Sequence, residues 1–237
     1  MDRNAVRTIR LTQVAILTLL AAAVQMQAQN VKTKYPAMAP LDQYMMERNS
    51  EIALARTAAP DSISHNAEVM VLTSKGYEVA AKGTNGFVCV VERSWETPAD
   101  DPDFWNPKLR GPVCFNAPAA QFNIPLLLVR TQSILAGRTE TQMFEDVKAA
   151  VDKGAVPPLQ PGAMCYMLSK QGYLSDAGGH WHPHLMFFVP LTQPAAWGAG
   201  LPGSPVVAAV PSTDERTTTF LVPVDKWSDG TPASESH

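Results

Sequence analysis

Three short runs of β-forming residues follow one another between residues 68 and 94, and they constrain the fold more than any other feature of the sequence. Two short connectors separate the runs, and the second contains Asn85-Gly86, the strongest short-range signal for a β-hairpin. We therefore predict a three-stranded antiparallel meander. Its strands are Glu68–Thr73, Tyr77–Ala81 and Phe87–Ser94.

Apolar residues at helical spacing flank this meander on both sides. One helix is predicted from Pro40 to about Thr57, because proline fits the first turn of a helix and Pro60 ends the pattern. A loop rich in proline and tryptophan, residues 95–118, leads to a pair of helices. The first of the pair begins near residue 118 or 125 and ends at 135, and the second covers 140–153. Thr139 and Gln142 have the spacing of a capping box at its start.

Four further β-rich runs complete the chain, at residues 163–168, 184–189, 206–210 and 217–224. The predicted fold class is therefore α+β, with the meander, the helical pair and about four more strands in one antiparallel sheet, and with the helices packed on one face. This element order is similar to that of the PAS, GAF and profilin-like ligand-binding folds. No motif accompanies the similarity, so it implies no function.

The first 28 residues have the composition of a secretory signal. Arg3, Arg7 and Arg10 precede an apolar run from Leu11 to Val24, and Ala28 favours cleavage before Gln29, with a cut near Ala23 as the alternative cleavage site. The alternative is a retained membrane anchor, but the run is short of the roughly 20 residues that a spanning helix needs. We predict a secreted or periplasmic protein with no stable membrane span after cleavage.

The remaining chain is expected to contain a lead-in and helix at 29–60, one α+β domain at 61–226 and a flexible tail at 227–237. A net charge of −3 and an isoelectric point near 5.9 exclude a strongly basic nucleic-acid-binding protein. The apolar content of 46% is enough for a sizeable core.

The chain has three cysteines, which in an oxidising compartment favours one disulfide and one free thiol. Cys89 lies in the third strand of the meander, and Cys114 follows the loop that leaves this strand. We predict a Cys89–Cys114 disulfide that pins the loop. The alternative is three buried thiols that pack as small apolar side chains.

Three of the five histidines lie within five residues, at His180, His182 and His184. Imidazole is the commonest neutral metal ligand, and histidines two residues apart on an extended chain point to one side. The segment is therefore predicted to bind a divalent transition metal such as zinc. The His-x-His pair resembles the cupin metal motif, but the glutamate that cupins place a few residues later is absent. The expected fourth ligand is Asp176, Glu92 or Asp225.

Two other interpretations of the histidines stay open. They line a metal-free polar pocket together with Trp181, or they are structural and hydrogen-bond the loop. Three function classes follow: a small-molecule- or metal-binding domain, a metal-dependent hydrolase, and a cell-envelope interaction module that uses the loop from Trp95 to Trp105 as its contact surface. The sequence leaves open whether the protein is an enzyme.

Overall fold

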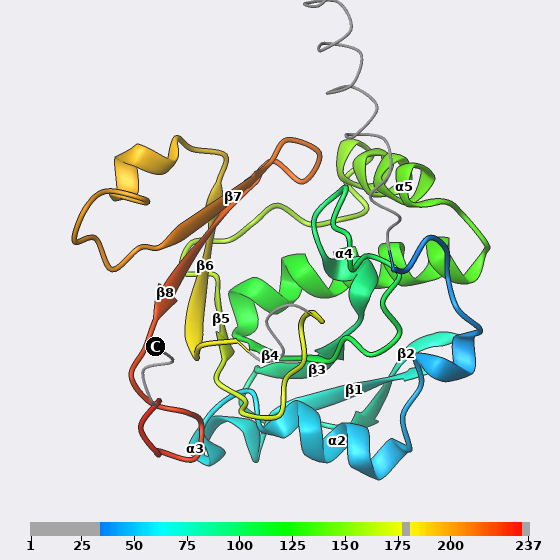
Figure 1. Ribbon diagram of the computed structural model, residues 1–237, viewed down its shortest axis with the longest axis horizontal. Coiled ribbons are helices and arrows are strands. Elements are labelled where there is room, and N and C mark those ends of the chain that lie inside the picture. The colour runs from blue at the N-terminus through cyan, green and yellow to red at the C-terminus, as the bar shows by residue number, and fades with distance from the viewer. Residues whose placement is uncertain (1–33, 177–180, 234–237) are drawn as a thin grey trace, which may run out of the picture. The chain divides into compact units, whose positions relative to one another are not determined.

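A mixed β-sheet forms the centre of residues 37–237 in the computed structural model, which describes residues 34–176 and 181–233 (Figure 1). Residues 1–36 form a separate unit. In chain order the elements of the described residues are η1 (Leu41–Gln43), α2 (Arg48–Arg56), α3 (Asp61–Ser64), β1 (Glu68–Thr73), β2 (Gly76–Ala81), β3 (Val88–Glu92), η2 (Ser94–Glu96), β4 (Gly111–Phe115), α4 (Ala117–Leu135), α5 (Glu140–Asp152), β5 (Met164–Met167), β6 (His184–Pro190), η3 (Pro194–Trp197), β7 (Ala208–Ser212) and β8 (Thr217–Pro223).

The eight strands of the described chain lie in the order β2-β1-β3-β4-β5-β6-β8-β7. All neighbouring pairs are antiparallel except β1 and β3, which are parallel. The predicted α+β class is therefore confirmed, whereas the purely antiparallel sheet is corrected to a mixed one.

The predicted meander is wrong at its third strand, because β3 pairs with β1 on the side opposite to β2. The connector between β2 and β3 crosses the start of β1 instead of forming a hairpin. Gly83 makes this crossing possible, since a Cβ there would lie 2.1 Å from the backbone nitrogen of Glu68. Asn85 does form a local turn, in which its side chain accepts a hydrogen bond from the Phe87 N–H at 3.1 Å.

Strand β4 lies within the segment that the sequence predicted as a loop. It pairs with β3 from Val88↔Phe115 to Glu92↔Gly111, so the sheet continues through the proline-rich region. The predicted disulfide is confirmed: Cys89 and Cys114 are direct partners in this pair, with a Cα–Cα distance of 4.0 Å.

Helices pack on both faces of the sheet, which corrects the prediction of a single covered face. Successive residues of a strand point to opposite faces. Cys89 and Val91 of β3 pack in one apolar cluster with Leu54 and Ala55 of α2. Val90 of the same strand packs in the other cluster, which includes side chains of α4 and α5.

The helix boundaries follow from local capping. Glu47 accepts hydrogen bonds from the N–H groups of Asn49 and Ser50, so the predicted N-terminal helix begins only at Arg48. Helix α5 begins with the predicted capping box of Thr139 and Gln142. No helix in the described ranges is long and apolar enough to cross a membrane.

The segment expected to form a tail makes contacts as far as the described residues extend. The Ser228 N–H donates to the Leu168 carbonyl at 2.9 Å, and Lys170 pairs with Asp229 at 2.9 Å. Residues 227–233 therefore return to the end of β5.

Candidate functional site

A cavity of about 1100 Å³ lies between the sheet and the helices α4 and α5. Strands β6, β8 and β7 extend beyond the part of the sheet that α4 crosses (Figure 1). Residues of all three strands line the cavity. Most of its wall is apolar. The apolar lining includes Leu109, Phe115, Leu126, Leu127, Phe144, Met167, Leu174, Met186, Phe188 and Leu221.

Four charged side chains from distant parts of the sequence line the inner wall: Glu92, Glu96, Arg130 and Glu215. Arg130, on α4, donates a short hydrogen bond to Glu215 in the β7–β8 turn. Its Nε lies 3.7 Å from Glu96 Oε2, and its Nη1 donates to the Trp95 carbonyl at 3.2 Å. One guanidinium thus acts on three acids, Glu215, Glu96 and Glu92. It favours their ionised forms, whereas burial and the repulsion between the acids favour retention of protons.

Glu92, the last residue of β3, faces the cavity without a partner. No hydrogen bond or ion pair joins its carboxyl to another residue in the described part of the chain. Room for it comes from Gly111 on β4, where a Cβ would lie 3.3 Å from Glu92 Cβ and 3.6 Å from Oε2. Burial raises the pKa of Glu92 to about 7, against the opposing effect of Arg130.

Glu96 is largely buried, with 12% of its side chain exposed. Its Oε1 is buried and has no hydrogen-bond partner among the described residues. Burial raises the pKa of Glu96 to about 8; Arg130 lowers it, and the neighbouring Glu92 and Glu215 raise it further. Glu92 and Glu96 are therefore acids that exchange protons near neutral pH, the range in which general acids and bases operate.

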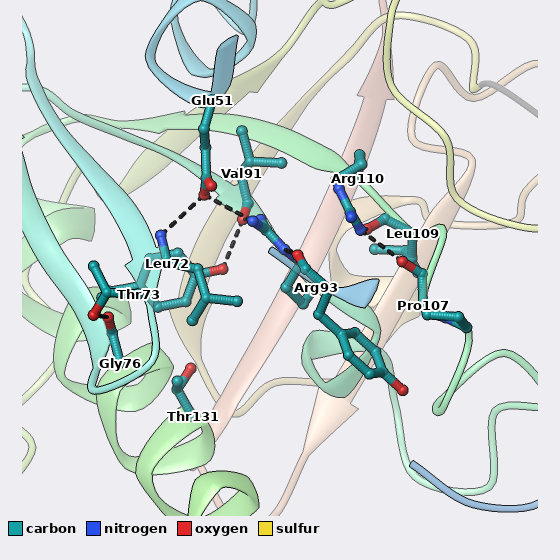
Figure 2. A network of polar contacts seen from close by, with 12 residues as sticks. Glu51, Leu72, Thr73, Gly76, Val91, Arg93, Pro107, Leu109, Arg110 and Thr131 are labelled. Carbon is teal, nitrogen blue, oxygen red and sulfur yellow. Dashed lines mark hydrogen bonds and ion pairs between the residues drawn. The ribbon is translucent and has the colours of Figure 1, made fainter. Parts of the chain in front are cut away.

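A second ionic network fixes the opposite face of the same strand end. Figure 2 shows Glu51 of α2 and Arg93 pointing toward one another, with Oε1 of Glu51 2.9 Å from Nη2 of Arg93. Both side chains are fully buried. Arg93 Nε also donates to the Tyr44 carbonyl at 2.7 Å, and the Leu72 N–H donates to Glu51 at 3.1 Å. Because Arg93 directly follows Glu92, this network holds the backbone that positions the cavity carboxyl.

Carboxylates also dominate the more exposed part of the cavity wall. The lysine there, Lys148, pairs with Asp152 four residues later on α5. Asp101 and Asp103 accept hydrogen bonds from their own loop, from the Asp103 N–H and the Asn106 side chain, each at 2.7 Å. The carboxylates of this rim are Asp100, Asp101, Asp103, Glu140, Glu145 and Asp214.

Of the three histidines predicted to bind metal, His184 lines the cavity. Its Nδ1 lies 2.8 Å from the His182 carbonyl oxygen, so Nδ1 carries the hydrogen and Nε2 is the free acceptor. Burial lowers the pKa of His184, which keeps the ring neutral. His182 is exposed, and His180 lies outside the described residues.

Within the described ranges, no group of three or more histidine, cysteine, aspartate or glutamate side chains is placed to hold a metal ion. Of the expected fourth ligands, Glu92 lines the same cavity as His184, whereas Asp176 accepts a hydrogen bond from Tyr173 and pairs with Lys108 at 3.4 Å. Trp181 is buried, and its indole donates to the Met167 carbonyl at 3.0 Å, so it packs behind the wall.

The loop from Trp95 to Trp105, which was expected to offer a contact surface, buries two of its aromatic side chains in the core, whereas residues 98–100 and 102 are exposed. Trp95 is fully buried and donates from its indole nitrogen to Thr131 at 3.1 Å. Phe104 is 1% exposed and stacks edge-on against Trp105. Cys165, the free thiol, is buried, and this burial raises its pKa well above the ordinary value.

Sequence reasoning missed Glu96, Arg130 and Glu215. One signal was present: Arg130 follows the apolar run Ile124–Val129, and a lone charge in an apolar helix requires a buried partner. The partner, Glu215, lies 85 residues away, beyond the reach of local sequence patterns.

Comparison of the chain with protein-family models, with curated proteins and with solved structures finds no match.

Proposed function

We propose that this protein binds a small, largely apolar molecule in the cavity between the sheet and helices α4 and α5. The observation that carries the proposal is the cavity itself, whose volume of about 1100 Å³ slightly exceeds the range of about 300–1,000 Å³ that is typical of ligand sites. Apolar side chains form most of its inner surface, and charged groups converge on it, a combination that is usual in such sites.

The proposal includes a location outside the cytoplasm. The basic and apolar residues at the N-terminus have the pattern of a secretory signal, and the Cys89–Cys114 disulfide fits an oxidising compartment. A mass measurement on the protein recovered from a bacterial periplasm tests this, with an N-terminus at Gln29 as the expected result.

Ligand-observed NMR with a library of small aromatic fragments tests binding. The variant Leu221→Trp places a large ring on the β8 wall and is expected to weaken fragment binding at least about tenfold. Val79→Trp adds a ring at a position on β2 that is 46% exposed, and is expected to leave binding unchanged. Equal binding by both variants, or no fragment bound by the parent protein, would exclude the cavity as a ligand site.

Metal binding by His180, His182 and His184 is a second proposal, with metal-assisted hydrolysis as its functional consequence. The supporting observations are the histidine spacing and the place of His184 on the cavity wall. Elemental analysis of the untagged protein tests it. About one equivalent of zinc or a similar metal, lost in His182→Ala, is the expected result, and equal metal content in the two proteins would overturn it.

A further inference from the structure

The carboxyl of Glu92 lies on the cavity wall, and no other side chain of the described residues forms a hydrogen bond or ion pair with it. Glu92 is half-buried and its carboxyl oxygens are open to the cavity, so a molecule bound there could reach them. Among the described side chains, Glu215 has Arg130 as its partner and Glu51 has Arg93, but Glu92 has none. The Glu92 carboxyl therefore has the position expected of a side chain whose hydrogen-bond partner is a bound ligand.

A buried acceptor without a hydrogen-bond partner among the described residues lies on the same wall. Glu96 Oε1 is buried and has no hydrogen-bond partner in the described chain, and only its Oε2 approaches Arg130. The two glutamates are four residues apart on the segment that joins β3 to η2. The donor at this end of the cavity, Arg130, already bonds Glu215 and the Trp95 carbonyl, so acceptors outnumber the donors that are still available there.

The negative charge of the cavity wall favours positively charged ligands. Six carboxylates line the exposed part of the cavity, and the one lysine among them is paired with Asp152. At the inner end, Arg130 is occupied by Glu215 and Glu96. A cleft lined by one sign of charge concentrates ligands of the opposite sign and repels those of its own.

We propose that the cavity binds an apolar molecule that carries a primary ammonium group, and that Glu92 is the carboxylate that accepts hydrogen bonds from this group. This inference rests on the proposed function of the cavity as a ligand site. The apolar side chains of Phe115, Met167 and Phe188 would contact the body of the ligand.

Glu92 is better placed for this role than the other two inner acids. Arg130 already forms an ion pair with Glu215 and lies 3.7 Å from Glu96, so its positive charge would repel a second cation most strongly beside those two carboxyls. Its charge also acts on Glu92, but without an ion pair. The charged and titratable groups that interact electrostatically with Glu92 are Arg130 on the cavity wall, Glu96 on η2, Tyr77 on β2 and Cys165 on β5. His184 lines the same cavity. His184 is neutral, so it does not repel an ammonium ion.

Three probes that differ only in their head group test the inference: 4-phenylbutylamine, 4-phenylbutanol and 4-phenylbutyrate. Isothermal titration of the full chain at pH 7.5 is expected to give the highest affinity for the amine, at least about tenfold weaker binding of the alcohol, and the weakest binding of the carboxylate. Glu92→Gln keeps the shape of the side chain and removes its charge. This variant is expected to bind 4-phenylbutylamine only as tightly as it binds 4-phenylbutanol. Its affinity for 4-phenylbutanol should equal that of the parent protein.

Glu78→Gln is the matched control, because it makes the same charge change at an exposed position on β2 and is expected to leave all three affinities unchanged. Equal affinity of the parent protein for amine and alcohol, or preference for the carboxylate, would overturn the ammonium inference while leaving the cavity as a ligand site. If Glu92→Gln binds 4-phenylbutylamine as tightly as the parent protein does, Glu92 is not the carboxylate that binds the ammonium group. Binding of none of the probes, together with a negative fragment screen, would refute the proposed function as well.

Discussion

Glu92 and Gly111 are direct partners across β3 and β4, and the missing side chain of Gly111 is what gives the Glu92 carboxyl its position. A Cβ on Gly111 would lie 3.6 Å from Glu92 Oε2 and 3.8 Å from Met167 Cε. The backbone of Gly111 does not have a positive φ, so the residue is needed for space and not for conformation. The pair therefore links a local feature of the sheet to the geometry of the proposed ligand site.

Gly111→Ala should displace the Glu92 carboxyl, because the added Cβ would lie 3.3 Å from Glu92 Cβ, closer than side chains usually pack. A binding group must be held within about 0.5 Å of its productive position. We expect the affinity for 4-phenylbutylamine to fall about three- to tenfold and the affinity for 4-phenylbutanol to change less than about twofold, measured by calorimetry.

A double-mutant cycle provides the control for this effect. If Gly111→Ala acts through Glu92, it should have no further effect on amine affinity in a Glu92→Gln background. An equal loss in both backgrounds would show that the added methyl group narrows the cavity directly.

The raised pKa of Glu92 predicts a specific pH dependence of stability. Between the ordinary value of 4.5 and about 7, the folded protein holds a proton that the unfolded chain has released. The free energy of unfolding should therefore decrease as pH rises through this window. Glu92→Gln removes this dependence and should be more stable than the parent at pH 8 by roughly 1–3 kcal/mol, relative to their difference at pH 4.

Urea denaturation at pH 4, 6 and 8 measures this difference. Glu78→Gln again serves as the control, and its curve should run parallel to that of the parent protein. A Glu92→Gln variant that loses stability at pH 8 would show that the ionised carboxyl is stabilised in the empty protein, contrary to its lack of a partner.

Elements with strong local signals could be predicted from the sequence. The capping box at Thr139 and Gln142 lies within one turn of helix and requires no tertiary information, so the start of α5 was predicted correctly. The Cys89–Cys114 disulfide was predicted because both residues lie at the ends of one loop. Strand β1 was predicted at its correct bounds, because its apolar run ends at a tight turn.

Features that depend on packing between distant segments could not be predicted. The turn signal of Asn85-Gly86 is local, but the path of the connector is decided by how closely Gly83 approaches Glu68. The inner wall of the cavity likewise requires Arg130 to meet a turn 85 residues later in the chain. The histidine cluster drew attention because the residues are adjacent in sequence, whereas the unpaired Glu92 became visible only when its surroundings were known.

The disulfide should stabilise the part of the sheet beside the cavity. It closes a segment of 25 residues that contains the loop on the cavity wall. Replacing both cysteines with serine should reduce the free energy of unfolding by about 3 kcal/mol, measured in urea.

The native protein should show no thiol that reacts with a soluble thiol reagent, because Cys165 is buried. After unfolding without reductant, one thiol should react. A thiol that reacts in the native state would contradict the buried position of Cys165.

Arg130 should be the most sensitive single position of the inner wall. Its side chain is 9% exposed and is the cation beside Glu215 and Glu96, so Arg130→Met leaves both carboxyls without a counter-charge. Removing one partner of a buried ion pair costs about 3–5 kcal/mol. We expect a loss of stability of this size at pH 8.5, where Glu96 is largely ionised, and a smaller loss at pH 5, where burial keeps the Glu96 carboxyl protonated.

The control is Arg138→Met, which removes a guanidinium that is 40% exposed. It should lower the free energy of unfolding by less than about 1 kcal/mol at either pH. An Arg130→Met variant whose loss of stability is the same at pH 5 and pH 8.5 would show that packing against Phe144, over which the guanidinium lies at 5.2 Å, outweighs the charge interaction.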